Sequence, residues 1–162
     1  MRKFILLFAS LIIIANISAQ NKERAIGFRG GETFGFTYNY NLDESISIGA
    51  ILKLSHNEIR IVILKEKVIP VLLSYSDHLF FYTGIGAHAG FVSWEKYRNN
   101  EFRSVNYCAP LIGADAVIGL EYRFFKYPFS LGAEYKPYVD LLGRKIFSLR
   151  LFDFGVTAKY NF

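Results

Sequence analysis

The chain ends in FDFGVTAKYNF, residues 152–162, and this stretch decides the fold. Its even-numbered positions are all apolar, whereas its odd-numbered positions are polar or glycine. Successive side chains of a β-strand point to opposite faces, so the stretch predicts a strand with one apolar and one polar face. A strand that lies between lipid and a polar interior requires this division. We therefore interpret residues 152–162 as a lipid-facing strand of a transmembrane β-barrel.

The N-terminus predicts export. Arg2 and Lys3 precede an apolar run over residues 4–14, and small residues lead to a cleavage site after Ala19. The run is too short for a transmembrane helix, which needs about 20 residues. We expect residues 1–19 to be a signal peptide and residues 20–162 to form one barrel domain.

Composition supports a barrel over other classes. The chain is 52% hydrophobic and 17% aromatic, yet the mature part has no long apolar run, and only helices and closed barrels satisfy their backbone hydrogen bonds in lipid. Without Arg2 and Lys3, 17 basic residues face 14 acidic ones, so the net charge falls from +5 to +3. The basic residues are scattered, which argues against nucleic acid and favours contact with anionic lipid headgroups.

The single cysteine, Cys108, cannot form an intramolecular disulfide. The spacing of cysteine and histidine does not suggest a zinc site. Phosphate-loop, dinucleotide and zinc-protease motifs are also missing from the sequence. We therefore expect no metal and no cofactor.

Alternation between apolar and polar residues recurs along the mature chain. It predicts eight strands, at residues 25–31, 33–41, 45–54, 59–73, 79–92, 111–125, 129–138 and 152–162. The fold class is therefore all-β, an eight-stranded antiparallel up-and-down transmembrane barrel. The register of 59–73 cannot be read, because apolar residues occupy both faces and Pro70 interrupts the segment. The polar stretches 93–109 and 140–151 are expected to be external loops.

Four segments of the chain carry a family resemblance. They are AIGFRGG at 25–31, FYTGIGAH at 81–88, DAVIGLEYRF at 115–124 and EYKP at 134–137. Together they resemble small outer-membrane β-barrel proteins of Bacteroidota. The resemblance implies an eight-stranded barrel located in the cell outer membrane, in a family whose function is largely undefined.

The apolar C-terminal residue resembles the signal by which outer-membrane barrels are recognised for assembly. The residues expected to form this signal are Phe154, Val156, Ala158, Tyr160 and Phe162. The expected partners are therefore outer-membrane lipid and the barrel assembly machinery. We expect a monomer in which loops 93–109 and 140–151 contact any surface ligand.

Charged residues recur on the polar faces of the predicted strands. The set expected to point into the lumen is Arg29, Lys53, His88, Asp115, Glu121, Arg123, Glu134, Lys136 and Lys159. An eight-stranded barrel is just wide enough for side chains to fill. Because a buried charge must be paired or solvated, we expect these residues to form a structural polar plug with no catalytic role.

Three alternatives to this non-enzymatic barrel remain open from the sequence. The first is a lipid A-modifying enzyme, for which His88, Ser93 and Glu95 are the candidate trio. The second is a narrow solute pore through the lumen. The third is a soluble, lipocalin-like binder of apolar ligands, in which the apolar faces would point inward.

Overall fold

The computed structural model describes residues 23–71, 78–97, 104–124 and 126–162. The predicted signal peptide, residues 1–19, lies outside these residues. The described strands are β1 (Arg24–Gly31), β2 (Gly35–Asn41), β3 (Ile46–Ser55), β4 (Glu58–Pro70), β5 (Leu79–Tyr97), β6 (Ser104–Arg123), β7 (Phe129–Tyr135), β8 (Tyr138–Leu142), β9 (Ser148–Arg150) and β10 (Phe154–Asn161).

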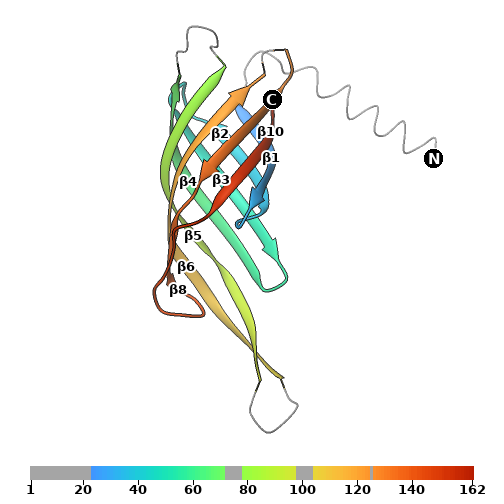
Figure 1. Ribbon diagram of the computed structural model, residues 1–162, viewed down its shortest axis with the longest axis vertical. Coiled ribbons are helices and arrows are strands. Elements are labelled where there is room, and N and C mark those ends of the chain that lie inside the picture. The colour runs from blue at the N-terminus through green and yellow to red at the C-terminus, as the bar shows by residue number, and fades with distance from the viewer. Residues whose placement is uncertain (1–22, 72–77, 98–103, 125) are drawn as a thin grey trace, which may run out of the picture.

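The sheet closes on itself as a barrel (Figure 1). Each strand from β1 to β6 pairs antiparallel with the next, β6 pairs with β7 and β8, and β10 pairs with both β7 and β1. Since β7 continues into β8 and β9 continues into β10, the wall has eight strands. The predicted eight-stranded antiparallel barrel is confirmed.

Two wall strands are interrupted at the same height. β7 ends before Lys136 and Pro137, while β10 starts after Asp153. Hydrogen bonds bridge the gap: the backbone N–H of Lys136 donates to the carbonyl of Asp153 at 2.8 Å, and that of Ala116 donates to the carbonyl of Pro137 at 3.0 Å. The wall therefore stays connected where its regular ladders stop, since buried backbone groups must find partners.

The start of β1 and the C-terminus lie together at one end of the barrel, here called the termini end, where the backbone N–H of Arg24 donates to the carbonyl of Phe162 at 3.1 Å. The hairpins β1–β2, β3–β4, β5–β6 and β8–β9 turn at the opposite end, which we call the distal end (Figure 1). At the termini end, the β2–β3 turn is held by Asp43, whose carboxylate accepts hydrogen bonds from the backbone N–H groups of Ser45 and Ile46. Hydrogen bonding to Ser45 lowers the pKa of this exposed carboxyl.

The stretch 93–109 was predicted as a loop, and this is wrong for most of its length. β5 and β6 stay paired from Ser93 opposite Cys108 to Tyr97 opposite Ser104, and the hairpin projects beyond the rest of the barrel (Figure 1). Beyond the barrel both of its faces can meet water, so its sequence loses the apolar alternation that marks a strand in lipid.

The stretch 140–151 was also predicted as a loop, but the wall strands continue into it. β8 reaches Leu142, and β9 covers residues 148–150. The pairing of β8 with β6 shifts register beside Ile112. Such an irregularity breaks the period of two in the sequence.

The register of the fourth strand, unreadable from sequence, is defined in the structure. β4 pairs with β5 along its whole length and with β3 from Glu58 to Lys67. Its inward side chains are Arg60, Val62, Leu64, Glu66 and Val68, which are all buried. Three of these five are apolar, so the inward face does not look polar in the sequence.

The outer surface of the barrel is apolar. Large exposed side chains occur on the outside of every long strand, and examples are Phe28, Phe36, Leu52, Ile61, Ile85, Ile118, Leu131 and Val156. Lys65 and Lys67 also face outward on β4, where the long lysine stem lets an ammonium group reach a membrane surface. The inverted assignment, with apolar side chains inside and charges outside, is therefore wrong. In the described ranges, no helix has the length and hydropathy needed to span a membrane.

An arginine on the outer surface should test whether that surface faces lipid. Ile118 is 48% exposed on the outside of β6. We expect Ile118→Arg to lower the free energy of unfolding in lipid vesicles by about 2–4 kcal/mol, because this position lies near the middle of the apolar surface. Unfolding in urea, followed by gel mobility without boiling, measures the change.

Asn106→Arg is the matched control, because Asn106 is exposed on the same outward face of β6 but lies in the projecting hairpin. A change of less than about 1 kcal/mol is expected there. Equal effects at the two positions would contradict a lipid-facing surface at Ile118.

Candidate functional site in the barrel lumen

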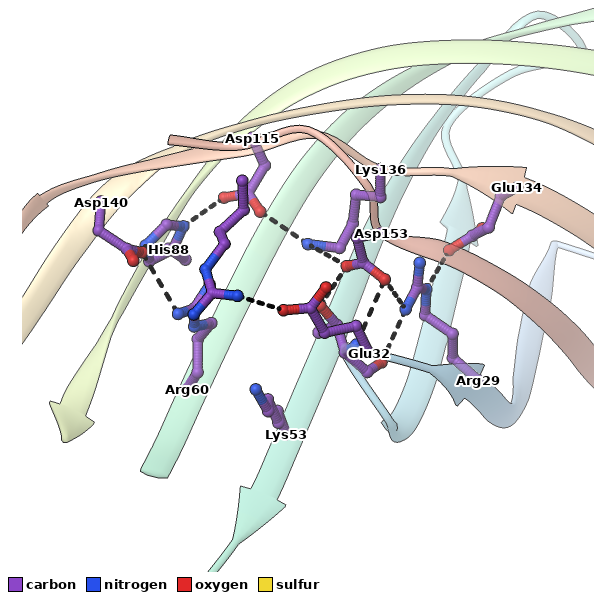
Figure 2. Close-up of polar contacts among 12 residues, drawn as sticks. Arg29, Glu32, Lys53, Arg60, His88, Asp115, Glu134, Lys136, Asp140 and Asp153 are labelled. Carbon is purple, nitrogen blue, oxygen red and sulfur yellow. Dashed lines mark hydrogen bonds and ion pairs between the residues drawn. The ribbon is translucent and has the colours of Figure 1, made fainter. Parts of the chain in front are cut away.

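Arg29, Glu134 and Asp153 form the part of the lumen network that we call the Arg29 centre (Figure 2). The Arg29 side chain is fully buried. Its Nε donates to Oε1 of Glu134 at 2.5 Å, and its Nη1 donates to Oδ1 of Asp153 at 3.0 Å and to the carbonyl of Thr33 at 2.9 Å. The Thr33 hydroxyl also donates to Asp153. One guanidinium thus connects β1, β7, the start of β10 and the β1–β2 turn.

Lys136 extends the network from the Arg29 centre. Its Nζ donates to Oδ1 of Asp115 at 2.8 Å and lies 3.7 Å from Oδ2 of Asp153. Both carboxylates and the ammonium group are buried. Lys136 therefore links β6 to the interrupted strands, at the point where β7 gives way to β8.

His88 lies between two aspartates farther toward the distal end (Figure 2). Its Nδ1 is 2.6 Å from Oδ2 of Asp115, and its Nε2 is 3.0 Å from Oδ1 of Asp140. Both contacts suit the imidazolium form, since only that form donates from both nitrogens. Arg60 completes this part of the network, with Nη2 3.3 Å from Oδ1 of Asp140 and its guanidinium carbon 4.4 Å from the ring centre of Tyr138.

A second cluster occupies the termini end of the lumen. Oε2 of Glu121 accepts a hydrogen bond from Nζ of Lys159 at 2.8 Å, and Oε1 accepts one from Nε of Arg123 at 2.7 Å. Glu66 accepts hydrogen bonds at 3.0 Å from Asn39 and from Ser47. A vestibule of about 490 Å³ opens at this end, and Arg123 lies on its lining.

The lumen is less polar than the sequence predicted. The interior also holds a buried apolar cluster, which consists of Ile51, Val62, Leu64, Val68, Tyr82 and Val117. The hydroxyl of Tyr82 donates to Oε2 of Glu134 at 2.5 Å and joins this cluster to the Arg29 centre. The lumen is therefore filled by ion pairs and by an apolar layer together.

Glycines make room for the largest lumen side chains. A Cβ on Gly119 would lie 2.4 Å from the Tyr82 ring, and one on Gly155 would lie 2.7 Å from the guanidinium carbon of Arg29. Both distances are too short for real contacts. The inward glycines are thus required by close packing in a narrow barrel.

The structure places all nine of the predicted lumen residues on the inner side of the wall. Seven are buried, namely Arg29, His88, Asp115, Glu121, Glu134, Lys136 and Lys159. Lys53 lies near the distal rim and pairs with Glu58 at 3.1 Å, and the Arg123 side chain is 32% exposed at the other end. The nine residues belong to two clusters. Glu121, Arg123 and Lys159 belong to the cluster at the termini end, and the other six belong to the network that includes the Arg29 centre.

The sequence reasoning missed further ionisable members of the lumen. Among them are Glu58, Arg60, Glu66, Tyr82, Asp140 and Asp153. Asp153 could have been found, because it lies on the polar face of the C-terminal strand. Arg60 and Glu66 could not, since they share a face with three aliphatic residues of β4, and Asp140 fell in a predicted loop.

The candidate catalytic trio is not assembled. His88 faces the lumen, and both of its ring nitrogens already contact aspartates. Ser93 is an odd number of residues away on the same strand and points to the other face, where its hydroxyl lies 3.4 Å from the carbonyl of Asn57. Among the residues that the structure describes, no group of histidine, cysteine and acidic side chains could hold a metal ion.

The fold is similar to a solved structure. The N-terminal β-barrel domain of Pseudomonas aeruginosa OprF superposes with a TM-score of 0.58 at 14% sequence identity, and the match covers 86% of this chain and 95% of that one. At this identity the likeness concerns the fold alone. No protein-family model matches the sequence, and a search of curated proteins gives no match.

Removing Arg29 should unfold the lumen network from its centre. We expect Arg29→Met to lower the free energy of unfolding by about 3–5 kcal/mol, because it leaves the carboxylates of Asp153 and Glu134 buried with fewer partners. Urea unfolding of the refolded barrel measures the change.

Arg150→Met is the control, because Arg150 pairs with Glu32 at 3.1 Å while their side chains are 57% and 38% exposed. A loss below about 1 kcal/mol is expected for this surface pair. Similar losses in the two variants would show that the buried network does not hold the barrel together.

Proposed function

We propose that this chain is an integral outer-membrane β-barrel, non-enzymatic, with a lumen closed by its own side chains. The observation that carries the proposal is the division between an apolar exterior and an ion-paired interior. Such an exterior would be unfavourable in water, whereas a closed barrel meets the requirement that every backbone group in lipid be hydrogen-bonded. The predicted signal peptide supports export to the envelope.

The closed lumen favours a role in envelope structure or surface contact. Ion pairs and the apolar cluster fill much of the interior, and this supports a lumen that does not let solutes pass. The distal end, where hairpins β5–β6 and β8–β9 emerge, would face the outside of the cell, because chain termini of such barrels lie in the periplasm. These hairpins are the surfaces available for contact.

We further propose that the chain belongs with the small outer-membrane barrels of Bacteroidota that four of its segments resemble. Its C-terminal strand would be recognised by the barrel assembly machinery. The assembly residues Phe154, Val156, Ala158, Tyr160 and Phe162 lie on the outward face of the last wall strand. That position would leave them accessible before the barrel closes. We expect the inserted protein to be a monomer.

Fractionation tests the membrane assignment. The full chain, expressed in a Gram-negative host, should be found in the outer membrane and should migrate differently on a denaturing gel with and without boiling. A closed barrel resists detergent until it is heated, since its hydrogen bonds form a continuous ring. A protein recovered from the periplasm without a heat-dependent shift would contradict the proposal.

Conductance tests the closed lumen. We expect the refolded protein to give no current above baseline in planar bilayers, because paired charges and apolar side chains fill the interior. A fluorophore on the exposed Cys108 reports insertion, so silent bilayers are counted only when they contain protein. Stepwise currents from labelled bilayers would show a pore.

A further inference from the structure

The apolar outer surface continues beyond the barrel on the β8–β9 hairpin. Leu141 and Leu142 are exposed at the end of β8, and Leu149 is exposed on β9. Ile146 and Phe147, in the turn between them, are 85% and 65% exposed. Large exposed apolar residues thus continue from the wall to the tip of this hairpin.

The β5–β6 hairpin emerges at the same end, but the residues on its outward face differ. Phe91 is the last large apolar residue on the outside of β5, and Ser93 and Glu95 follow it on that face. On β6 the corresponding outward residues are Asn106 and Cys108. The outward face of the β5–β6 hairpin therefore becomes polar beyond the barrel, although Trp94 and Tyr107 stack on its other face. The β8–β9 hairpin keeps large apolar side chains exposed up to its tip, and such a surface is stabilised by contact with an apolar phase.

Basic residues accompany the apolar tip. Arg144 and Lys145 are exposed and precede Ile146 directly in the turn. The combination of basic and large apolar side chains suits the boundary of a membrane, where phosphates lie above acyl chains. The guanidinium carbon of Arg144 lies 5.9 Å from the centre of the Trp94 ring, which leaves its N–H groups free to meet a phosphate at the same surface.

The backbone conformation at the tip indicates independently that Phe147 has a function. Phe147 has a φ of 61°, in the left-handed region that bulky residues rarely adopt. Glycine or asparagine would fit this position with less strain. A strained phenylalanine whose ring is exposed indicates that the ring itself has a use, since strain persists at functional positions.

We propose that the β8–β9 hairpin binds the surface of the outer leaflet, with Arg144 and Lys145 contacting lipid phosphates while Ile146 and Phe147 enter the acyl layer. This inference rests on the proposed membrane location. Lipid is the expected contact because the hairpin continues the apolar wall and carries positive charge. The β5–β6 hairpin then remains in water, available to other partners.

Single fluorescent probes test this assignment. In a full-length Cys108→Ser background, an environment-sensitive dye is attached at Phe147→Cys, at Leu149→Cys or at Asn106→Cys. The protein is refolded into phosphatidylcholine vesicles with and without phosphatidylglycerol, and brominated lipid is used as a quencher. We expect blue-shifted emission and several-fold stronger quenching at positions 147 and 149 than at 106.

The anionic lipid should deepen the insertion through the two basic residues. We expect the shift at position 147 to grow when phosphatidylglycerol is present, and this increase to be lost in Arg144→Glu/Lys145→Glu. The heat-dependent gel shift of that variant should be unchanged, because neither residue belongs to the lumen network.

The outcomes separate the two proposals. Protein that inserts and shifts on heating, yet leaves probes 147 and 149 as exposed to water as probe 106, would overturn the lipid contact and leave the membrane location standing. Equal emission with and without phosphatidylglycerol would overturn the recognition of phosphate. Failure to insert into any vesicle would overturn the membrane location, and the lipid contact with it.

Discussion

The burial of the Arg29 guanidinium between Asp153 and Glu134 is the interaction on which the rest of the barrel depends. Two wall strands lose their regular ladders at this height, and the guanidinium binds both of them and the carbonyl of Thr33. Taking one such charge out of water costs several kcal/mol unless its partners are well placed. The partners are placed here by β7, by the residue before β10 and by the β1–β2 turn, so the network and the closed wall form together.

The narrow interior explains the composition of the lumen. Eight strands leave an interior that side chains can just fill, and glycines beneath Tyr82 and Arg29 supply the missing space. The apolar cluster around Val62 and Leu64 fills part of the interior beside the charged groups. In each charged region, buried carboxylates pair with cationic side chains, which offsets part of the cost of removing them from water.

Sequence reasoning succeeded where each strand separates an apolar exterior from a polar interior. The alternation predicted the strand count, the closed barrel and the inward positions of Arg29, Glu134 and Lys159. It failed on β4, whose inner face carries Val62, Leu64 and Val68, and on residues 93–109, which extend beyond the barrel and lose the pattern. The sequence could not predict the ion pairs. His88 and Asp140, for example, come into contact because of the register between β5, β6 and β8, which the alternation does not define.

The charge balance inside the barrel bears on where the protein can act. In the described lumen, seven carboxylates lie among six permanent cations and His88: Glu58, Glu66, Asp115, Glu121, Glu134, Asp140 and Asp153 against Arg29, Lys53, Arg60, Arg123, Lys136 and Lys159. With His88 protonated the two signs are equal in number, so the interior presents little net field to an ion or ligand. Such an interior gives a charged solute little attraction, which agrees with the proposed contact through the outer surface. On that surface, the β5–β6 hairpin turns polar on its outward face beyond the barrel, whereas the β8–β9 hairpin adds two basic residues to the apolar surface that it continues.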